Sequence, residues 1–542
     1  MSPIEPESAT EAYDFPLLVK QLLLSPLLNT PGQEIVYADG QRYDYRGLGE
    51  RIHRLANVLD ALGVREGSTV AVMDWDSHRY LECFFAVPMM GAVLHTINVR
   101  LSPEQILYTI NHAEDDVLLV HTDFLALVEG IRERIEQPLT IVPMTDAGVE
   151  AGDTAGEYER LLAQAASEFD FPDFDERIRA TTFYTTGTTG NPKGVYYSQR
   201  QLVLHTLGIL AMVGSNGEHA RFHKDDVYMP ITPMFHVHAW GMPFIATTMG
   251  VKQVYPGRYE PEKLLRLIES EKVTFSHCVP TILHMLLSSP VADSVDLSGW
   301  KVVIGGSAMP GALAKAALDR GIDVFSGYGM SETGPVLTIA QLERSMLSGD
   351  QAELDLRCRA GRAGPLVDLR VVDEQMRDQA RGDEGEVVVR APWLTPGYLK
   401  NPQGSRSLWQ GGYLHTGDLG YLDEQGYLKI TDRLKDVIKT GGEWISSLTL
   451  EDIVTGHPGV AEAAAIGVPD EKWGERPVVL VVPRADLDEP LTPEDVRDRI
   501  EHAASAGEVS KWAVPERVEI IDSLAKTSVG KLDKKKLREQ WS

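Results

Sequence analysis

The chain has few of the features that mark secreted and membrane proteins. Its 542 residues include only three cysteines, Cys83, Cys278 and Cys358, which lie far apart and form no C-x-x-C pair. A disulfide framework and a cysteine-rich zinc site are therefore excluded. The first residues are acidic and contain no apolar segment, so we expect no signal peptide. No uncharged apolar run reaches the roughly 18 residues that span a bilayer, and we expect a cytoplasmic protein without integral membrane association.

Positive charge is scarce as well. Lysine and arginine total 52 against 79 aspartates and glutamates, which gives a net charge of −27. An acidic surface repels phosphate backbones and anionic lipids, so nucleic acid is not an expected partner. The hydrophobic content of 43% is ordinary for a folded protein with a large core and excludes a disordered or collagen-like chain. At about 150 residues per domain, we expect about two to four domains.

Apolar strands alternate with amphipathic helices along the chain, and this alternation predicts an α/β fold. The clearest expected elements are a hairpin over 34–45, a helix through 52–62, and buried strands at 69–73, 117–120 and 302–304. Residues 146–156 are rich in glycine and acid and predict a surface loop. The last expected strand runs directly into Gly305-Gly306-Ser307.

The best candidate for a domain boundary follows Ile430, where a β-like stretch gives way to a charged segment. The residues beyond it predict their own strands at 464–468 and 478–482 and a helix at 493–503, enough for a small α+β domain. The stretch 526–538 is strongly basic within an acidic protein. We expect such a segment to meet a polyanionic ligand.

The strongest local signal is the loop from Thr185 to Gly194, T-T-G-T-T-G-N-P-K-G, which follows an apolar strand end. Glycines allow close backbone approach, while threonine hydroxyls and one lysine supply donors and charge, a composition suited to phosphate. A plain Gly/Thr hairpin turn is the alternative. A Walker A motif is absent because Gly530-Lys531 precedes Leu532, and no G-x-G-x-x-G opens a helix after the first strands.

Further motifs follow the loop in order. They are P-M-F-H at 233–236, G-Y-G-M-S-E-T at 327–333, Y-L-H-T-G-D at 413–418, D-R-L-K-D at 432–436 and T-S-V-G-K at 527–531. Together with the loop they resemble the adenylate-forming (AMP-binding) superfamily over nearly the whole chain. The stretches 236–240 and 438–446 resemble bacterial medium- and long-chain fatty acyl-CoA synthetases and methylmercaptopropionate-CoA ligases most closely. Ser331 replaces the usual threonine, and Ala525 stands where the family usually has proline.

The resemblance implies a large multi-layer α/β domain over 1–431 and a small mobile α+β domain over 432–542, with a hinge at Asp432. It implies an AMP-forming ligase that activates a carboxylic acid with ATP and Mg²⁺ and transfers the acyl group to CoA. Medium-chain fatty or arylalkyl acids are the expected substrates, and a homodimer is the expected assembly. One alternative delivers the acyl group to an amine or a carrier protein. Another is a non-catalytic nucleotide-binding paralogue, which the retention of Lys531 and Glu332 disfavours.

The same resemblance assigns roles to individual residues. Lys531 is the expected catalytic lysine, although the neighbouring lysines also fit a solvated surface. Glu332 and Thr185 are expected metal ligands, because hard carboxylate and hydroxyl oxygens suit Mg²⁺. The remaining expected nucleotide contacts are Thr186, Gly187, Thr188, Thr189, Gly190, Lys193, Gly305, Gly306, Ser307, Gly327, Tyr328, Gly329, Ser331, Asp418 and Arg433. For Arg433 a surface salt bridge is the alternative.

Two further groups concern the acyl chain and CoA. His236 is expected beside the acid carboxylate and Trp240 at the gate of an acyl tunnel, with core packing as the alternative for both. Because they are four residues apart, a helix there would place both side chains on one face. Residues of the segment after the hinge are expected to approach the CoA channel once the small domain rotates; they are Lys439, Gly441, Gly442, Glu443 and Trp444.

Overall fold

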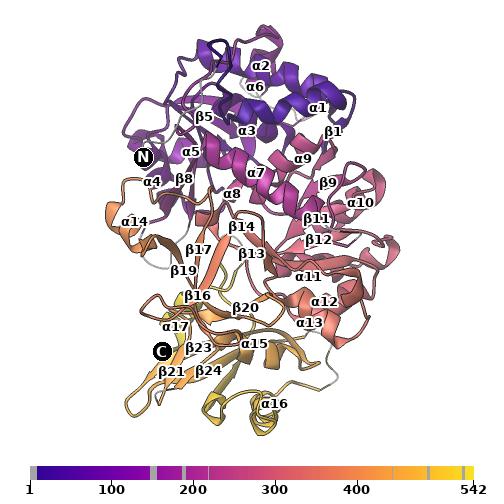
Figure 1. Ribbon diagram of the computed structural model, residues 1–542, viewed down its shortest axis with the longest axis vertical. Coiled ribbons are helices and arrows are strands. Elements are labelled where there is room, and N and C mark those ends of the chain that lie inside the picture. The colour runs from indigo at the N-terminus through magenta and orange to yellow at the C-terminus, as the bar shows by residue number, and fades with distance from the viewer. Residues whose placement is uncertain are drawn as a thin grey trace.

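The computed structural model describes residues 9–146, 156–185, 191–215, 217, 219–441, 443–484, 487, 489–527 and 531–542. Thr186 to Gly190, Gly442 and most of the expected loop at 146–156 therefore lie outside the described residues. The strands in the described ranges form four sheets, of six, nine, five and five strands. Figure 1 shows their succession along the molecule, from the N-terminal part at the top to the C-terminal part at the bottom.

The first two sheets are mostly parallel. The first has the order β6 (Thr140–Met144), β5 (Val117–His121), β3 (Thr69–Met73), β4 (Val93–Thr96), β7 (Arg179–Thr185), β8 (Lys193–Ser198), with only β8 antiparallel to its neighbour. The second has the order β15 (Arg362–Ala363), β14 (Val336–Ile339), β13 (Asp323–Gly329), β12 (Lys301–Ile304), β11 (Phe275–Cys278), β9 (Val227–Pro230), β10 (Lys252–Tyr255), β1 (Glu34–Tyr37), β2 (Arg42–Asp44). Strands β3, β5 and β12 are buried along their whole length, as expected for sheets covered on both faces.

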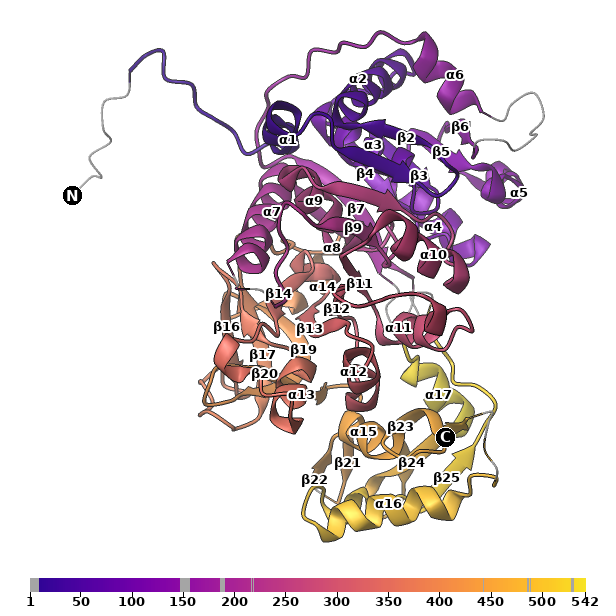
Figure 2. The same cartoon turned by 90° about the vertical axis from the view of Figure 1, so that its right-hand side faces the viewer.

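The third and fourth sheets are mainly antiparallel. The third is built from β16 (Asp368–Val372), β17 (Gly385–Arg390), β19 (Tyr413–Leu422), β18 (Trp409–Gln410) and β20 (Leu428–Arg433), which pairs with β19. The fourth is built from β22 (Glu443–Ile445), β21 (Ile438–Thr440), β24 (Gly474–Pro483), β23 (Val460–Asp470) and β25 (Arg517–Ile520). Figure 2 shows the fourth sheet and its helices as a separate body at one end of the molecule.

Helices cover these sheets. They are α1 (Leu24–Asn29), α2 (Tyr45–Ala61), α3 (His78–Met89), α4 (Pro103–Ala113), α5 (Thr122–Ile131), α6 (Glu157–Gln164), α7 (Gln199–Gly214), α8 (Val237–Trp240), α9 (Met242–Met249), α10 (Pro261–Glu271), α11 (Pro280–Leu287), α12 (Gly311–Leu318), α13 (Gln351–Cys358), α14 (Pro402–Leu408), α15 (Ser447–Thr455), α16 (Pro493–Ser505) and α17 (Lys534–Trp541). Their starts follow local sequence rules. For example, Ser102 and Gln105 form a capping box around Pro103 at the start of α4. Among the described helices, none combines the length and apolarity needed to cross a membrane.

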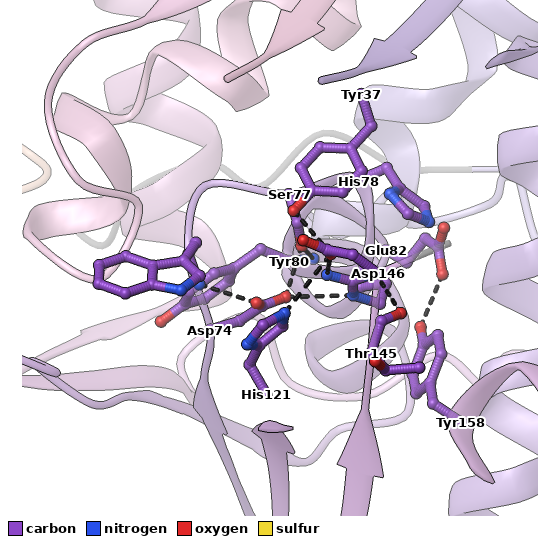
Figure 3. Close-up of polar contacts among 12 residues, drawn as sticks. Tyr37, Asp74, Ser77, His78, Tyr80, Glu82, His121, Thr145, Asp146 and Tyr158 are labelled. Atoms are coloured by element: carbon purple, nitrogen blue, oxygen red, sulfur yellow. Dashed lines mark hydrogen bonds and ion pairs between the residues drawn. The ribbon is translucent and has the colours of Figure 1, made fainter. Parts of the chain in front are cut away.

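A buried polar cluster joins the carboxyl ends of β3, β5 and β6 to the start of α3 (Figure 3). Arg79, only 1% exposed, lies 3.3 Å from Asp74 and 2.7 Å from Asp146. Asp146 also accepts a hydrogen bond from the Tyr37 hydroxyl at 2.8 Å and lies 3.5 Å from His121. Because these residues come from separate elements, the cluster ties the sheet, the helix and β1 together.

Candidate active site

The nucleotide end of the site is built where β12 ends. The chain turns at Gly305 and Gly306, and Gly306 adopts φ +83°, a backbone region that favours glycine. A methyl group at Gly306 would lie 3.1 Å from Cε of Lys531 and 3.1 Å from Val279. The lysine from the C-terminal part therefore rests against the turn predicted to face adenine, while Ser307 next to it is exposed. The structure therefore brings together Lys531 and the turn at 305–307.

Lys531 lies in a mixed electrostatic environment. Its burial, together with the nearby charges of Arg433 and Lys435, lowers the pKa of its ammonium to about 8. The carboxylates of Asp418 and Glu332 act in the opposite direction and raise that pKa. Lys531 is therefore a cation with a lowered pKa that lies near two candidate ligand-binding carboxylates. Such an environment is typical of a functional site rather than a solvated surface.

Asp418 and Arg433 face each other across the pairing of β19 and β20. Nε of Arg433 lies 3.2 Å from Oδ1 of Asp418, and the Tyr328 hydroxyl donates a hydrogen bond to Oδ2 at 2.7 Å. Burial and the Asp418 charge raise the pKa of that tyrosine well above its usual value. Arg433 thus forms a salt bridge, and its partner is Asp418, itself a predicted nucleotide contact; the nucleotide contact of Arg433 stays a prediction.

The G-Y-G-M-S-E-T segment spans the end of β13 and a short 3-10 helix, η4 (Ser331–Thr333). A methyl group at Gly329 would lie 1.7 Å from the carbonyl oxygen of Pro335, so no larger residue fits there. Gly327 lies opposite Ile339 in β14, and the Ser331 carbonyl accepts a 2.6 Å hydrogen bond from the Tyr197 hydroxyl. These contacts fix the turn that presents Glu332.

The phosphate end is marked by Glu332 and Lys193. Glu332 is 7% exposed, and its Oε1 accepts a 2.7 Å hydrogen bond from the Tyr398 hydroxyl. Lys193, the first residue of β8, is paired with Thr185, the last residue of β7, and its Nζ lies 4.7 Å from the centre of the Tyr398 ring. A cavity of about 630 Å³ is lined by Lys193, Tyr398, Met330 and Gly417 among others.

His236 precedes α8 and is partly buried. Burial, together with the positive charges of Lys531 and Arg100, lowers the pKa of its imidazole to about 3, so the ring is neutral at physiological pH. Because the charge of Lys531 acts on this imidazole, the two side chains lie near each other. A neutral ring there can orient an acid or a thiol by hydrogen bonding without adding charge.

The expectation that a right-handed helix carries His236 and Trp240 on one face is wrong. All four residues of α8 adopt left-handed conformations, with φ between 47° and 58°, and Gly241 continues the turn at φ 73°. His238 lies 2.7 Å from Thr181 Oγ1 and holds the turn against β7. His236 itself is extended, with φ −95° and ψ 100°, so it does not share a helix with Trp240 and helical spacing does not relate the two side chains. Trp240 is still close to the nucleotide turn, because a methyl group at Gly305 would lie 2.9 Å from its indole.

Trp240 is also a core residue. It is 7% exposed, its ring centre lies 5.0 Å from that of His277, and it belongs to the apolar cluster under β11 to β13. His277 in turn contacts the Tyr228 hydroxyl at 2.8 Å. The indole thus lies between a packed interior and the turn at Gly305, and its role as a gate stays a prediction.

Asp432, the predicted hinge, is the second-to-last residue of β20 and lies opposite Leu419. The predicted division between residues 431 and 432 therefore falls inside this strand, and the domain limits stay a prediction. The Asp432 carboxylate is buried and accepts hydrogen bonds from the Ser447 backbone N–H at 2.6 Å and from its hydroxyl at 2.9 Å. Lys534 donates to the same hydroxyl at 2.6 Å. The residue thus links the third sheet to α15 and α17.

The predicted CoA-channel residues lie in the β21–β22 hairpin of the fourth sheet. Lys439 and the exposed Trp444 face each other, with Nζ 4.8 Å from the ring centre. The Gly441 N–H donates to the carbonyl of Trp473, and Glu443 accepts from the Ser510 hydroxyl at 2.6 Å. These contacts lie within the C-terminal part, so this arrangement does not bring the hairpin to Lys531.

Several basic side chains of the stretch 526–538 are paired within the protein, and a polyanionic ligand for this segment stays a prediction. Lys526 pairs with Glu462 and Lys534 with Glu451, each at 2.7 Å, and Arg538 pairs with Asp436 at 2.8 Å. These neighbours anchor α17 and the segment before it. Lys531 differs from them because it points to the Gly306 turn.

Tyr398 is the residue that the sequence did not reveal. It contacts both Glu332 and Lys193, yet it lies outside every motif considered above. Its only local signal is an aromatic residue in a loop rich in proline and glycine, P-W-L-T-P-G-Y-L, and such a signal fits any packed loop.

Comparison with known proteins agrees with this geometry. The AMP-binding enzyme family matches residues 27–399, and its C-terminal domain matches residues 449–531. A long-chain-fatty-acid–CoA ligase of Thermus thermophilus is 43% identical over 92% of this chain and 90% of its own. A 3-methylmercaptopropionyl-CoA ligase of Ruegeria pomeroyi is 38% identical over 92% of both chains.

A medium-chain-fatty-acid–CoA ligase of Ectopseudomonas oleovorans is 36% identical over 91% of this chain and 89% of its own. Among solved structures, ATP-bound MatB from Rhodopseudomonas palustris superposes with a TM-score of 0.83 at 26% identity, over 97% of this chain and 99% of its own. The fold, the nucleotide site and these relatives agree. The chain therefore belongs to the AMP-binding enzyme family and is a homologue of AMP-forming acid–CoA ligases.

Proposed function

We propose that this acyl-CoA ligase joins a medium-chain fatty or arylalkyl acid to CoA in two steps. In the first, a carboxylate oxygen attacks the α-phosphorus of ATP and pyrophosphate leaves, which gives acyl-AMP. In the second, the CoA thiol loses its proton and its sulfur attacks the acyl carbon, which releases AMP. The observation that carries the proposal is the Lys531 side chain lying against Gly306, close to Asp418 and Glu332.

The first step brings an anion to an anion, so the site must supply fixed positive charge. Lys531 serves the developing charge near the α-phosphate, and Lys193 faces the cavity expected to hold the outer phosphates. Asp418, already paired with Arg433 and Tyr328, is placed to accept hydrogen bonds from ribose hydroxyls. His236, neutral and close to Lys531, would orient the acid.

Glu332 and Thr185 would hold a magnesium ion. The donor set fits, because Glu332 is a buried carboxylate that a neutral hydroxyl orients without removing its charge. When bound there, the ion would neutralise phosphate charge and polarise the reacting phosphoryl oxygens. Thr185 ends β7 directly opposite Lys193, so its backbone lies at the phosphate end.

The substrate proposal rests on the surroundings of Trp240. Beyond it, Gly241 packs closely on His205, because a methyl group there would lie 2.8 Å from the imidazole, and Met242 and Phe244 supply buried apolar surface. Long-chain, medium-chain and methylmercaptopropionyl substrates, named for the relatives above, all carry an unbranched apolar chain. We infer an acid of intermediate length, with the indole at the point where the tail meets the core.

The second step requires the C-terminal part to turn about Asp432, so that the β21–β22 hairpin replaces Lys531 near the thiol. Gly441 would leave room for the narrow pantetheine arm, while Lys439, Glu443 and Trp444 would line its path. This rotation is a proposal supported by the position of Asp432 between two sheets. The homodimer stays a prediction from the family resemblance, and the cytoplasmic location stays a prediction from the features that the sequence lacks.

A pyrophosphate-release screen over straight-chain acids of graded length, with and without CoA, tests the function. Without CoA we expect one pyrophosphate released per enzyme molecule, and with CoA we expect sustained turnover. The rate with CoA should be highest for medium-chain acids. A preference for acetate would contradict the substrate class. Turnover that does not depend on CoA, but appears with an amine or a carrier protein, would contradict the acceptor.

A further inference from the structure

Tyr398 contacts two oppositely charged side chains of the phosphate end. Its hydroxyl donates to Oε1 of Glu332 at 2.7 Å, and the Lys193 ammonium lies 4.7 Å from the centre of its ring. One side chain therefore holds an anion at its polar end and a cation at its aromatic face. Cation–π contacts of this kind attract the ammonium without neutralising it.

The backbone around Tyr398 is fixed to the strand that follows the phosphate loop. Tyr398 forms an isolated bridge with Val195, and the Leu399 N–H donates to the Gly194 carbonyl at 2.8 Å. The Tyr398 N–H donates to Ser405 Oγ at 2.9 Å, which closes the loop before α14. A movement of β8 would therefore move Tyr398 as well.

The ring also forms part of the wall of the 630 Å³ cavity, together with Lys193. A direct Lys193–Glu332 ion pair would cancel the charge of both groups. A neutral phenol contacts each of them and leaves a full negative charge for a metal ion and a full positive charge for phosphate oxygens.

We propose that Tyr398 is a positioning residue for metal-bound ATP. Its hydroxyl orients the Glu332 carboxylate toward the divalent cation, and its ring orients Lys193 toward the phosphates. The inference rests on the proposed metal role of Glu332, and it adds that the two charges are set by one tyrosine. It predicts that the hydroxyl and the ring contribute to binding in separable ways.

Equilibrium binding of ATP by calorimetry, without acid or CoA, separates the two contributions. In Tyr398→Phe the hydroxyl is lost and the ring remains, so ATP affinity in the presence of Mg²⁺ should fall about tenfold. Its affinity for ATP in EDTA should equal that of the wild type. In Tyr398→Leu the ring is lost too, so ATP affinity should fall in both conditions.

Tyr197→Phe is the matched control. It removes another buried tyrosine hydroxyl that donates to the same short helix, but to the Ser331 carbonyl rather than to a carboxylate. We expect it to lower the melting temperature about as much as Tyr398→Phe while leaving the Mg²⁺ enhancement of ATP binding unchanged. Equal losses with Mg²⁺ and with EDTA in Tyr398→Phe, or an unchanged enhancement, would overturn the inference. Wild-type ATP binding that does not respond to Mg²⁺ would instead refute the metal site at Glu332.

Discussion

If Lys531 serves the proposed adenylation step, its charge should set an alkaline limit to that step. Burial and the positive charges of Arg433 and Lys435 bring the pKa of Lys531 to about 8, against the opposing effect of Asp418 and Glu332. Because the folded pKa is lowered, the ammonium is charged at neutral pH and loses its proton as the pH rises through about 8. If only the charged form supports adenylation, kcat/KM for ATP should follow this titration.

The magnitude follows from the fraction charged. With a pKa of about 8, that fraction falls from about 0.9 at pH 7 to about 0.01 at pH 10, so kcat/KM should fall by roughly a hundredfold, or about 2.7 kcal/mol. An unshifted lysine would stay mostly charged over the same range, and the rate would change less than about twofold. The two cases are therefore easy to tell apart.

ATP–pyrophosphate exchange without CoA is the appropriate assay, because it reports the first step alone. Its kcat/KM for ATP reflects ionisation in the free enzyme, in which Lys531 has no bound substrate beside it. Lys531→Arg is the control, since a guanidinium stays charged throughout; we expect lower activity with no alkaline decline. A wild-type profile that stays flat to about pH 10, or the same decline in Lys531→Arg, would refute the reasoning.

Three further outcomes are expected. Asp432→Pro should form acyl-AMP but stall in thioester synthesis, since proline fixes φ. Asp432→Ala is the control, because it loses the same hydrogen bonds with Ser447 but keeps φ free. Equal stalling in both variants would argue against a hinge. In the wild type kcat/KM should rise about fourfold per methylene until the pocket is full, and Trp240→Ala should shift the optimum to longer acids; an unchanged chain-length profile would exclude a gate. Asp146→Asn should lower the free energy of unfolding by about 2 kcal/mol in chemical denaturation at neutral pH, because Arg79 loses an ionic partner. Burial alone would raise the pKa of Asp146, but the neighbouring His121, Arg79 and Tyr37 outweigh that effect and hold the pKa below its usual value. The stability that the carboxylate adds is therefore present above about pH 4 and is lost on acidification, so the difference should shrink toward about pH 2.

Local pattern was sufficient for much of the fold. The predicted strand at 69–73 coincides with β3, and the hairpin over 34–45 is present as β1 and β2 around Gly40 at φ 99°. The expected helix at 493–503 corresponds to α16. Each of these elements is determined by residues close in sequence, such as alternating apolar positions, a turn glycine or a helix cap.

What the sequence did not reveal depends on distant residues. The cluster around Arg79 joins β1, β3, α3, β5 and β6, and no local pattern marks it. Tyr398 acquires its partners only when its loop packs on β8. The left-handed turn was missed because none of its four residues is glycine, so the usual signal for positive φ is absent.

That turn has a consequence for attempts to stabilise the enzyme. Left-handed conformations cost non-glycine residues about 1–2 kcal/mol each, and four in a row approach the net stability of many domains. Glycine at Ala239 would relieve part of this cost, so selection by heat alone should favour it. The same change would loosen the backbone that holds the Trp240 indole against Gly305. Directed evolution for thermal tolerance alone would therefore reduce the selectivity between short and long acids that is proposed for Trp240. Each round of selection should also measure the ratio of activities on short and long acids.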